Sequence, residues 1–212
     1  MAVPLLSVRD VSVRFGGIVA LDGITFDIHA GQIAGLIGPN GAGKTTLFNC
    51  LSRLYIPNDG DIQFEGKSIL SAPRHAIPKI GLGRTFQNVA LFDHLTVLDN
   101  VKVGCHSQSS RGFIANGLRL PGVAGEEQRI TERAWELIEF MEVQPFALMP
   151  AGPLAFPIRK RVELARALAA SPKLLLLDEP AAGLNHDEID VLEAQIRRVR
   201  DLQKVTVLLV EH

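Results

Sequence analysis

The nine residues GPNGAGKTT, from Gly38 to Thr46, have the composition and spacing of a loop that binds nucleotide phosphates. They match the pattern G-x-x-x-x-G-K-S/T in full, between an apolar run and an amphipathic helical pattern. Glycines let successive backbone N–H groups turn toward phosphate oxygens, and the dipole of the following helix favours an anion. The alternative, a glycine-rich helix start that carries a lysine by chance, does not explain the complete pattern. The sequence therefore predicts a nucleotide site.

Two side chains of this loop have more specific expected roles. Lys44 should reach the β- and γ-phosphates, and the Thr45 hydroxyl should be a ligand for Mg²⁺. The loop residues expected to contact the nucleotide are Gly38, Pro39, Asn40, Gly41, Ala42, Gly43, Lys44, Thr45 and Thr46.

A pair of acidic residues follows a second apolar run, LLLLDEP. The run predicts a buried strand that ends at Asp178, and α/β sheets bind ligands at the carboxyl ends of their strands. Asp178 has the chemistry for the Mg²⁺ site, through a bound water, and Glu179 can polarise water for attack on the γ-phosphate. The alternative is a solvated acidic strand end, which the presence of a phosphate loop disfavours.

Two kinds of strand pattern predict the elements that position these residues. Three apolar runs, Gln32–Gly38, Lys173–Glu179 and Val205–Glu211, predict strands buried on both faces. Amphipathic helical patterns separate them, which indicates a parallel sheet with crossover helices, and the stretch 99–157 has helical patterns alone. Alternating apolar residues predict a further, antiparallel layer. These residues are Val11, Val13, Phe15, Ile24, Phe26, Ile28, Ile62 and Phe64.

Composition excludes several classes of protein. Hydrophobic residues make up 47% and charged residues 21% of the 212 residues, as in a globular chain, and a net charge of −1 gives no reason to expect nucleic acid. Cys50 and Cys105 form neither a metal spacing nor a disulfide framework, which suits a reducing compartment. No apolar run approaches the roughly 18 residues of a spanning helix, and the stretch MAVPLLSVRD lacks the apolar h-region of a signal peptide. A role at a membrane would therefore need another anchor.

Together these motifs resemble the ATP-binding-cassette ATPases, over essentially the whole chain. GLGRTFQN supplies Gln87, which matches the glutamine that in this family contacts Mg²⁺ or water and faces the transport subunit. AAGLN resembles the dimer-contacting loop, with Asn185 where many members have Asp. VRFGG resembles the loop whose aromatic side chain stacks on adenine, which makes Phe15 the candidate; the alternative is a core residue of an edge strand.

The resemblance implies a fold and a domain organisation. The fold class is α/β: a P-loop NTPase with a RecA-like parallel sheet core, an N-terminal antiparallel β layer and an inserted α-helical subdomain. The expected domains are 1–98, the nucleotide-binding core, 99–157, the helical subdomain, and 158–212, where the core continues. VLLVEH matches the strand that delivers a switch histidine, His212, to the γ-phosphate. Family members continue beyond this point, so the chain is expected to be truncated.

A narrower resemblance concerns function. GLGRTFQNVALFDHLTVLDNV and LLLLDEPAAGLN are similar to ATPase subunits of branched-chain amino-acid importers, although importers for urea or other amides share the pattern. This implies ATP and Mg²⁺ as cofactors, and a second ATPase subunit, in a homo- or heterodimer, as one partner. Transmembrane permeases and, indirectly, an extracytoplasmic substrate-binding protein are the other implied partners. The implied location is cytoplasmic, on the inner face of the membrane.

Two rival functions belong to other classes. A cassette protein of translation or DNA repair usually carries tandem cassettes or coiled-coil inserts, which this sequence lacks. A small-molecule kinase would need an acceptor-binding lid, and it would not explain Gln87, the acid pair and the terminal EH together.

The signature motif departs from the family, which commonly has LSGGQ at a helix start and uses it to bind the γ-phosphate across the dimer. Here Leu154 keeps the first position, Ala155 lacks the hydroxyl, Phe156 and Pro157 replace both glycines, and Ile158 replaces the glutamine. Pro157 has no N–H to donate, although it suits a first helical turn. Either the helix dipole suffices, or the chain works in an asymmetric heterodimer with one weak site.

Overall fold

A computed structural model describes residues 3–85, 89–105 and 123–211. The chain forms two compact units, one from Met1–Gln87 with Lys173–His212 and the other from Asn88–Pro172. No helix in these described stretches combines the length and the apolar composition needed to cross a membrane.

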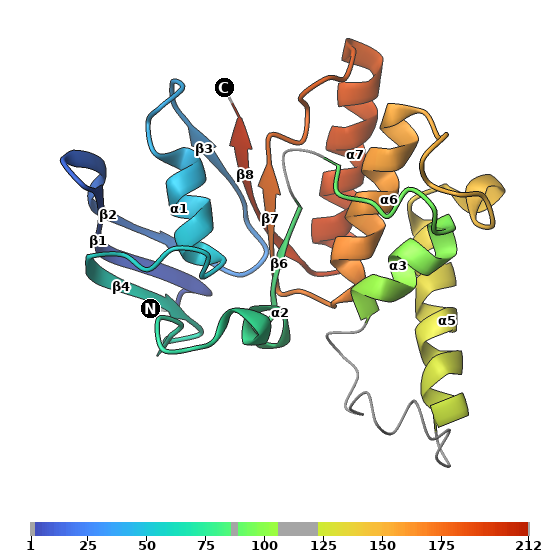
Figure 1. Cartoon of the computed structure of the whole chain (residues 1–212), viewed down its shortest axis with the longest axis horizontal. Coiled ribbons are helices and arrows are strands. Elements are labelled where there is room, and N and C mark those ends of the chain that lie inside the picture. Colours follow the sequence, from blue (N-terminus) through green and yellow to red (C-terminus); the bar gives the residue numbers. More distant parts are fainter. Residues whose placement is uncertain (1–2, 86–88, 106–122, 212) are drawn as a thin grey trace. The chain divides into compact units, whose positions relative to one another are not determined.

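The first unit contains an antiparallel sheet and a parallel sheet, as the sequence predicts (Figure 1). The antiparallel sheet has the strand order β2-β1-β4-β5, and the parallel sheet has the order β3-β8-β7-β6. The strands are β1 (Leu6–Phe15), β2 (Ile18–Ile28), β3 (Ile33–Ile37), β4 (Asp59–Phe64), β5 (Lys67–Ser68), β6 (Leu82–Arg84), β7 (Leu174–Asp178) and β8 (Thr206–Glu211). The α/β fold class is therefore confirmed.

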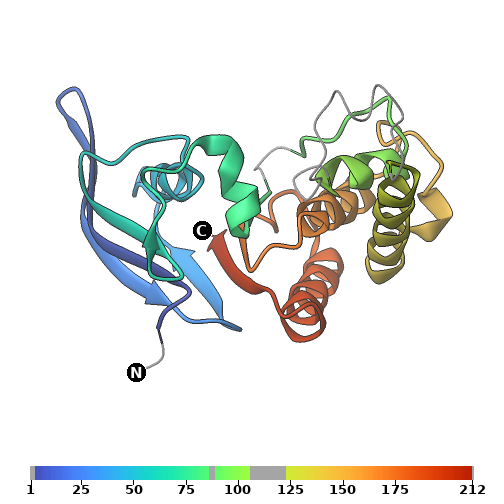
Figure 2. The same ribbon diagram turned by 90° about the horizontal axis from the view of Figure 1, so that it is seen from below.

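Helix α1 (Lys44–Leu51) lies between the two sheets, where both views show it (Figures 1 and 2). Phe48 and Leu51 are fully buried in a core that also takes side chains from both sheets. Apolar contact on both sides fixes the helix, and therefore fixes its N-terminus. The other helices of this unit are η1 (Arg74–Ala76), α2 (Ile77–Ile80) and α7 (His186–Leu202), and α7 packs against β8.

One strand differs from its predicted environment. The apolar run at Gln32–Gly38 predicts burial on both faces, yet Ile37 of β3 is 77% exposed and Gly35 is exposed too. Within the described part of the chain β3 pairs with β8 alone, so it lies at the edge of the sheet. In contrast, β7 lies between β8 and β6, and all of its residues are buried as predicted.

The second unit is helical. Its elements are α3 (Val97–Cys105), α5 (Val123–Phe140), η3 (Gln144–Phe146) and α6 (Phe156–Ala169). The three α-helices contact one another, and the buried Asn100 amide donates to the carbonyls of Phe92, Leu95 and Thr96 ahead of α3. This compact unit, Asn88–Pro172, includes α6 because α6 packs against α3, and the domain division into 1–98, 99–157 and 158–212 stays a prediction.

The packing of α3 on α6 depends on Gly104. A Cβ atom there would overlap the carbonyl oxygen of Arg166 and would lie 2.9 Å from the Cβ of Ala169. We expect Gly104→Ala to lower the free energy of unfolding by about 1–3 kcal/mol, as overpacking does. Urea unfolding followed by circular dichroism measures this loss.

Gly125 of α5 supplies the matched control, because nothing lies within 4 Å of a Cβ atom placed there. Gly125→Ala should be neutral or should stabilise the helix by up to about 1 kcal/mol. Equal midpoints for wild type and Gly104→Ala would contradict the described contact between α3 and α6.

Candidate functional site

The predicted phosphate loop connects β3 to α1, and the residue just before α1 must be glycine. Gly43 is the N-cap of α1 with φ 84°, in the left-handed region. A Cβ atom there would overlap the carbonyl oxygen of Ala20 and would lie 2.7 Å from Leu21 Cδ2. The loop therefore passes close to β2 before the helix begins, and the helix presents its first N–H groups at this point.

Lys44 folds back over the loop. Its ammonium group donates hydrogen bonds to the carbonyl oxygens of Gly38 and Pro39, the second at 3.1 Å, and the side chain is buried. Thr45 is exposed, so its hydroxyl is accessible to a ligand. A fixed positive charge beside a helix N-terminus favours a bound anion.

Strand register brings the acid pair to the loop's edge of the sheet. Ile37 lies opposite Glu211, and Asp178 lies opposite Val210, in parallel strands. The residues that follow β3, β7 and β8 therefore leave the sheet at the same end, the carboxyl end of its strands. This is where α/β proteins bind ligands. Asp178 thus occupies the predicted strand end.

The backbone at Glu179 is strained. Its φ is 49°, in the left-handed region that a residue with a side chain rarely adopts, and its N–H donates to the carbonyl of Val210 at 3.2 Å. The Glu211 carboxylate accepts a hydrogen bond from the N–H of Ala181 at 3.1 Å. β8 therefore holds both sides of the turn that carries Glu179, and such strain often accompanies a functional position.

Two residues near the acid pair are absent from the predicted site. Arg84, at the end of β6, donates to Asp178 Oδ2 at 2.8 Å, and both side chains are nearly buried. The sequence analysis predicts no strand at Leu82–Arg84, so no local pattern indicates this pair, although buried charges are almost always paired. Asn185 caps α7 in a reciprocal arrangement with Glu188, with bonds of 2.9 and 3.0 Å. The spacing N-x-x-E is the signal for that cap.

Phe15 lies on the surface, which argues against its being a core residue of an edge strand. It is 47% exposed at the end of β1 and meets the ring of Tyr55 edge-on, with centroids 5.3 Å apart. Tyr55 has no sequence pattern that would have indicated this contact. An exposed aromatic pair can offer a face to a planar ring.

Gln87 and His212, two predicted catalytic residues, lie outside the described residues. Among residues 3–85, 89–105 and 123–211, no group of three or more His, Cys, Asp or Glu side chains could hold a metal ion by itself. In nucleotide sites Mg²⁺ binds one or two carboxylates together with substrate phosphates. The exposed Thr45 hydroxyl and the Asp178 carboxylate supply suitable oxygen donors.

The degenerate signature lies at the start of α6. Ala155 is the N-cap, with an extended backbone and no side-chain hydrogen bond to the helix. Pro157 lies in the first turn, as the sequence predicts. The helix start therefore has neither a capping oxygen nor a full set of N–H donors.

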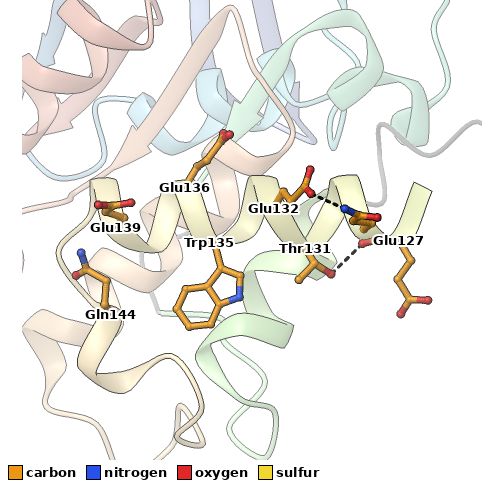
Figure 3. A pocket seen from close by; sticks show the side chains of 8 residues that line it. Glu127, Thr131, Glu132, Trp135, Glu136, Glu139 and Gln144 are labelled. Carbon is orange, nitrogen blue, oxygen red and sulfur yellow. Dashed lines mark hydrogen bonds between the residues drawn. The ribbon is translucent and has the colours of Figure 1, made fainter. Parts of the chain in front are cut away.

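A hollow of about 790 Å³ lies along α5, and the Trp135 ring projects from the helix on the same side as Thr131 (Figure 3). Its lining residues are Glu127, Gln128, Thr131, Glu132, Trp135, Glu136, Glu139 and Gln144. None of the predicted site residues lines it.

Known proteins match this chain throughout its length. Over 212 residues it is 42% identical to the high-affinity branched-chain amino acid transport ATP-binding protein BraF of Pseudomonas aeruginosa, and 38% identical to LivG of Escherichia coli. Each alignment covers 100% of this chain and 83% of the relative.

Solved structures agree with these matches. MJ1267, an ATP-binding cassette of an ABC transporter in its ADP conformation, has a TM-score of 0.85 at 28% identity, covering 100% of this chain and 82% of the other. For cbiO1 from Clostridium perfringens, part of the ABC transporter complex cbiONQ, the TM-score is 0.83 at 28% identity, with coverage of 99% and 78%. The ABC transporter family profile matches residues 21–182. The chain therefore belongs to the ABC transporter family, as one of its ATP-binding cassettes.

Proposed function

We propose that this chain is the ATP-binding subunit of an importer for branched-chain amino acids, in which ATP binding and hydrolysis drive transport. The observation that carries the proposal is the register of β3, β8 and β7, which brings the strand end before the phosphate loop and the strand end at Asp178 to the same end of the parallel sheet. The names of BraF and LivG support the solute class. An importer for urea or another amide is the alternative within the same family.

Each site residue has a proposed task. Lys44 and the loop N–H groups hold the phosphates, while Thr45, Asp178 and Gln87 hold Mg²⁺, which when bound neutralises phosphate charge. Glu179 orients and polarises the attacking water. His212 contacts the γ-phosphate, and the exposed ring of Phe15 stacks on adenine.

The assembly is also part of the proposal. The chain pairs with a second ATPase subunit and binds transmembrane permeases, which hold it at the cytoplasmic face of the membrane. An extracytoplasmic binding protein delivers the solute to the permeases. Support comes from membership of the transporter family and from cbiO1, which is part of a transporter complex. Co-purification with hydrophobic permeases would separate this role from that of a non-transport cassette.

Lys44→Ala tests the nucleotide site. Mg·ATP should raise the melting temperature of wild type and leave that of Lys44→Ala unchanged, because the variant lacks the charge that faces the phosphates. Lys67→Ala, at an exposed position of β5, is the control and should respond like wild type. An equal rise in the Lys44→Ala variant would show that the site is misassigned.

Glu179→Gln tests the chemical step. In the assembled transporter it should keep ATP affinity and lose about 10²–10⁴-fold in hydrolysis rate, the contribution of a general base. Glu193→Gln, on the exposed side of α7, should leave both unchanged. Phosphate release and nucleotide binding measure the two effects, and normal turnover by Glu179→Gln would exclude its proposed role.

The altered signature predicts an asymmetric pair. The start of α6 lacks the N–H of one residue, and losing one donor to a developing anion costs ~3 kcal/mol, or about 10²-fold in rate. The partner's site, which this signature would complete, should then hydrolyse weakly. Glu179→Gln should therefore remove most of the ATPase activity of the reconstituted pair, and the equivalent change in the partner should remove little. Equal losses would contradict the asymmetry.

A further inference from the structure

A single guanidinium group connects the acidic strand end to the helix that follows the phosphate loop. Arg84 Nη2 donates to Asp178 Oδ2 at 2.8 Å, while Nη1 donates to Asn49 Oδ1 at 2.9 Å and to Ser52 Oγ at 3.1 Å. Asn49 belongs to α1, and Ser52 is its C-cap. β6, β7 and α1 therefore meet at one side chain.

The ring of Phe48 also constrains the guanidinium plane of Arg84. The guanidinium carbon of Arg84 lies 5.7 Å from the ring centroid of Phe48, which is fully buried in the core. Such a cation–π contact adds to the hydrogen bonds in fixing the group. A lysine ammonium is a point charge and could not reproduce the planar fork that reaches both Asp178 and α1.

Stability alone does not account for this buried pair. The side chains of Arg84 and Asp178 are 10% and 5% exposed, so both charges have lost most of their hydration. Desolvation can cancel the attraction in such a pair, and apolar residues of the same volume would often serve stability as well. What the pair does supply is a fixed orientation of one carboxylate at the edge of the sheet.

We infer that Arg84 is a positioning residue for Asp178: by holding Oδ2 it fixes the orientation of the carboxylate that would serve the Mg²⁺ of a bound nucleotide. The inference rests on the proposed function, because it requires an Mg·nucleotide site at Asp178. Partners that hydrogen-bond a ligating carboxylate typically contribute 10–100-fold to metal affinity. The contacts to Asn49 and Ser52 tie this orientation to α1, whose N-terminus carries the phosphate loop.

Arg84→Met is the main test. The measured quantity is the Mg²⁺ factor, the ratio of the nucleotide Kd without metal to the Kd with Mg²⁺. Calorimetry gives the Kd of a non-hydrolysable ATP analogue with Mg²⁺ and with a chelator. In Arg84→Met this factor should fall by about 10-fold or more, and the Kd without metal should stay within about 2-fold of wild type. A guanidinium that merely competes with the metal for Asp178 would give the opposite sign, tighter binding with Mg²⁺.

Further variants keep the inference testable if Arg84→Met folds poorly. Asn49→Ala and Ser52→Ala keep the ion pair but each removes a hydrogen-bond acceptor of the guanidinium. Each should therefore lower the Mg²⁺ factor, but by less than Arg84→Met does. Arg84→Lys should lie between wild type and Arg84→Met. Arg9→Met breaks an exposed pair with Asp27, of 2.7 Å, on the antiparallel sheet, and it should change neither Kd.

The possible outcomes separate the two proposals. A wild-type protein that binds the analogue without any effect of Mg²⁺ would remove the proposed metal site itself. A wild type with a clear Mg²⁺ factor, together with an equal or larger factor in Arg84→Met, would overturn the positioning role alone. An equal loss of affinity with and without metal would assign Arg84 a purely structural role and would also overturn the inference.

Discussion

The parallel register of β3, β8 and β7 is the constraint on which the site depends. It sets Ile37 against Glu211 and Asp178 against Val210, so the phosphate loop and the acid pair leave the sheet together. A slip of one residue would turn every side chain of a strand to the other face. The fully buried β7 makes such a slip expensive, because it would move leucines and Asp178 between different environments. Apolar packing of the strands thus fixes the positions of the phosphate loop and the acid pair along the sheet.

Local patterns were enough to predict the parts of the site whose geometry is local. The loop between β3 and α1, the buried strand β7 and the proline in the first turn of α6 each depend on about ten residues of sequence, and the structure contains all three. That the loop binds phosphate stays a prediction. The contact of Arg84 with Asp178 could not be predicted in the same way, since 94 residues separate them and the fold alone brings them together. The exposure of Ile37 was missed because an apolar run does not reveal how many neighbours a strand has.

The extent of the compact helical unit depends on contacts between segments that are distant in the sequence. The helical pattern of α6 is visible in the sequence, but the compact unit to which α6 belongs is decided by the helices that α6 contacts. Gly104 lets α3 approach the backbone of α6 closely, and Arg159 and Asp93 form a further pair of 2.7 Å inside this unit. These contacts join segments on both sides of the predicted boundary at residue 157. Hydrophobic periodicity along the sequence does not predict such long-range contacts.

The left-handed backbone at Glu179 sets the stability of the fold against the proposed role of the Glu179 carboxylate. This conformation costs a residue with a side chain about 1–2 kcal/mol, and glycine would adopt it freely. Selection for a more stable fold would therefore favour the loss of the carboxylate at this turn. If Glu179 has its proposed role, libraries screened by thermal stability alone should accumulate glycine or asparagine at this position and lose ATPase activity with it.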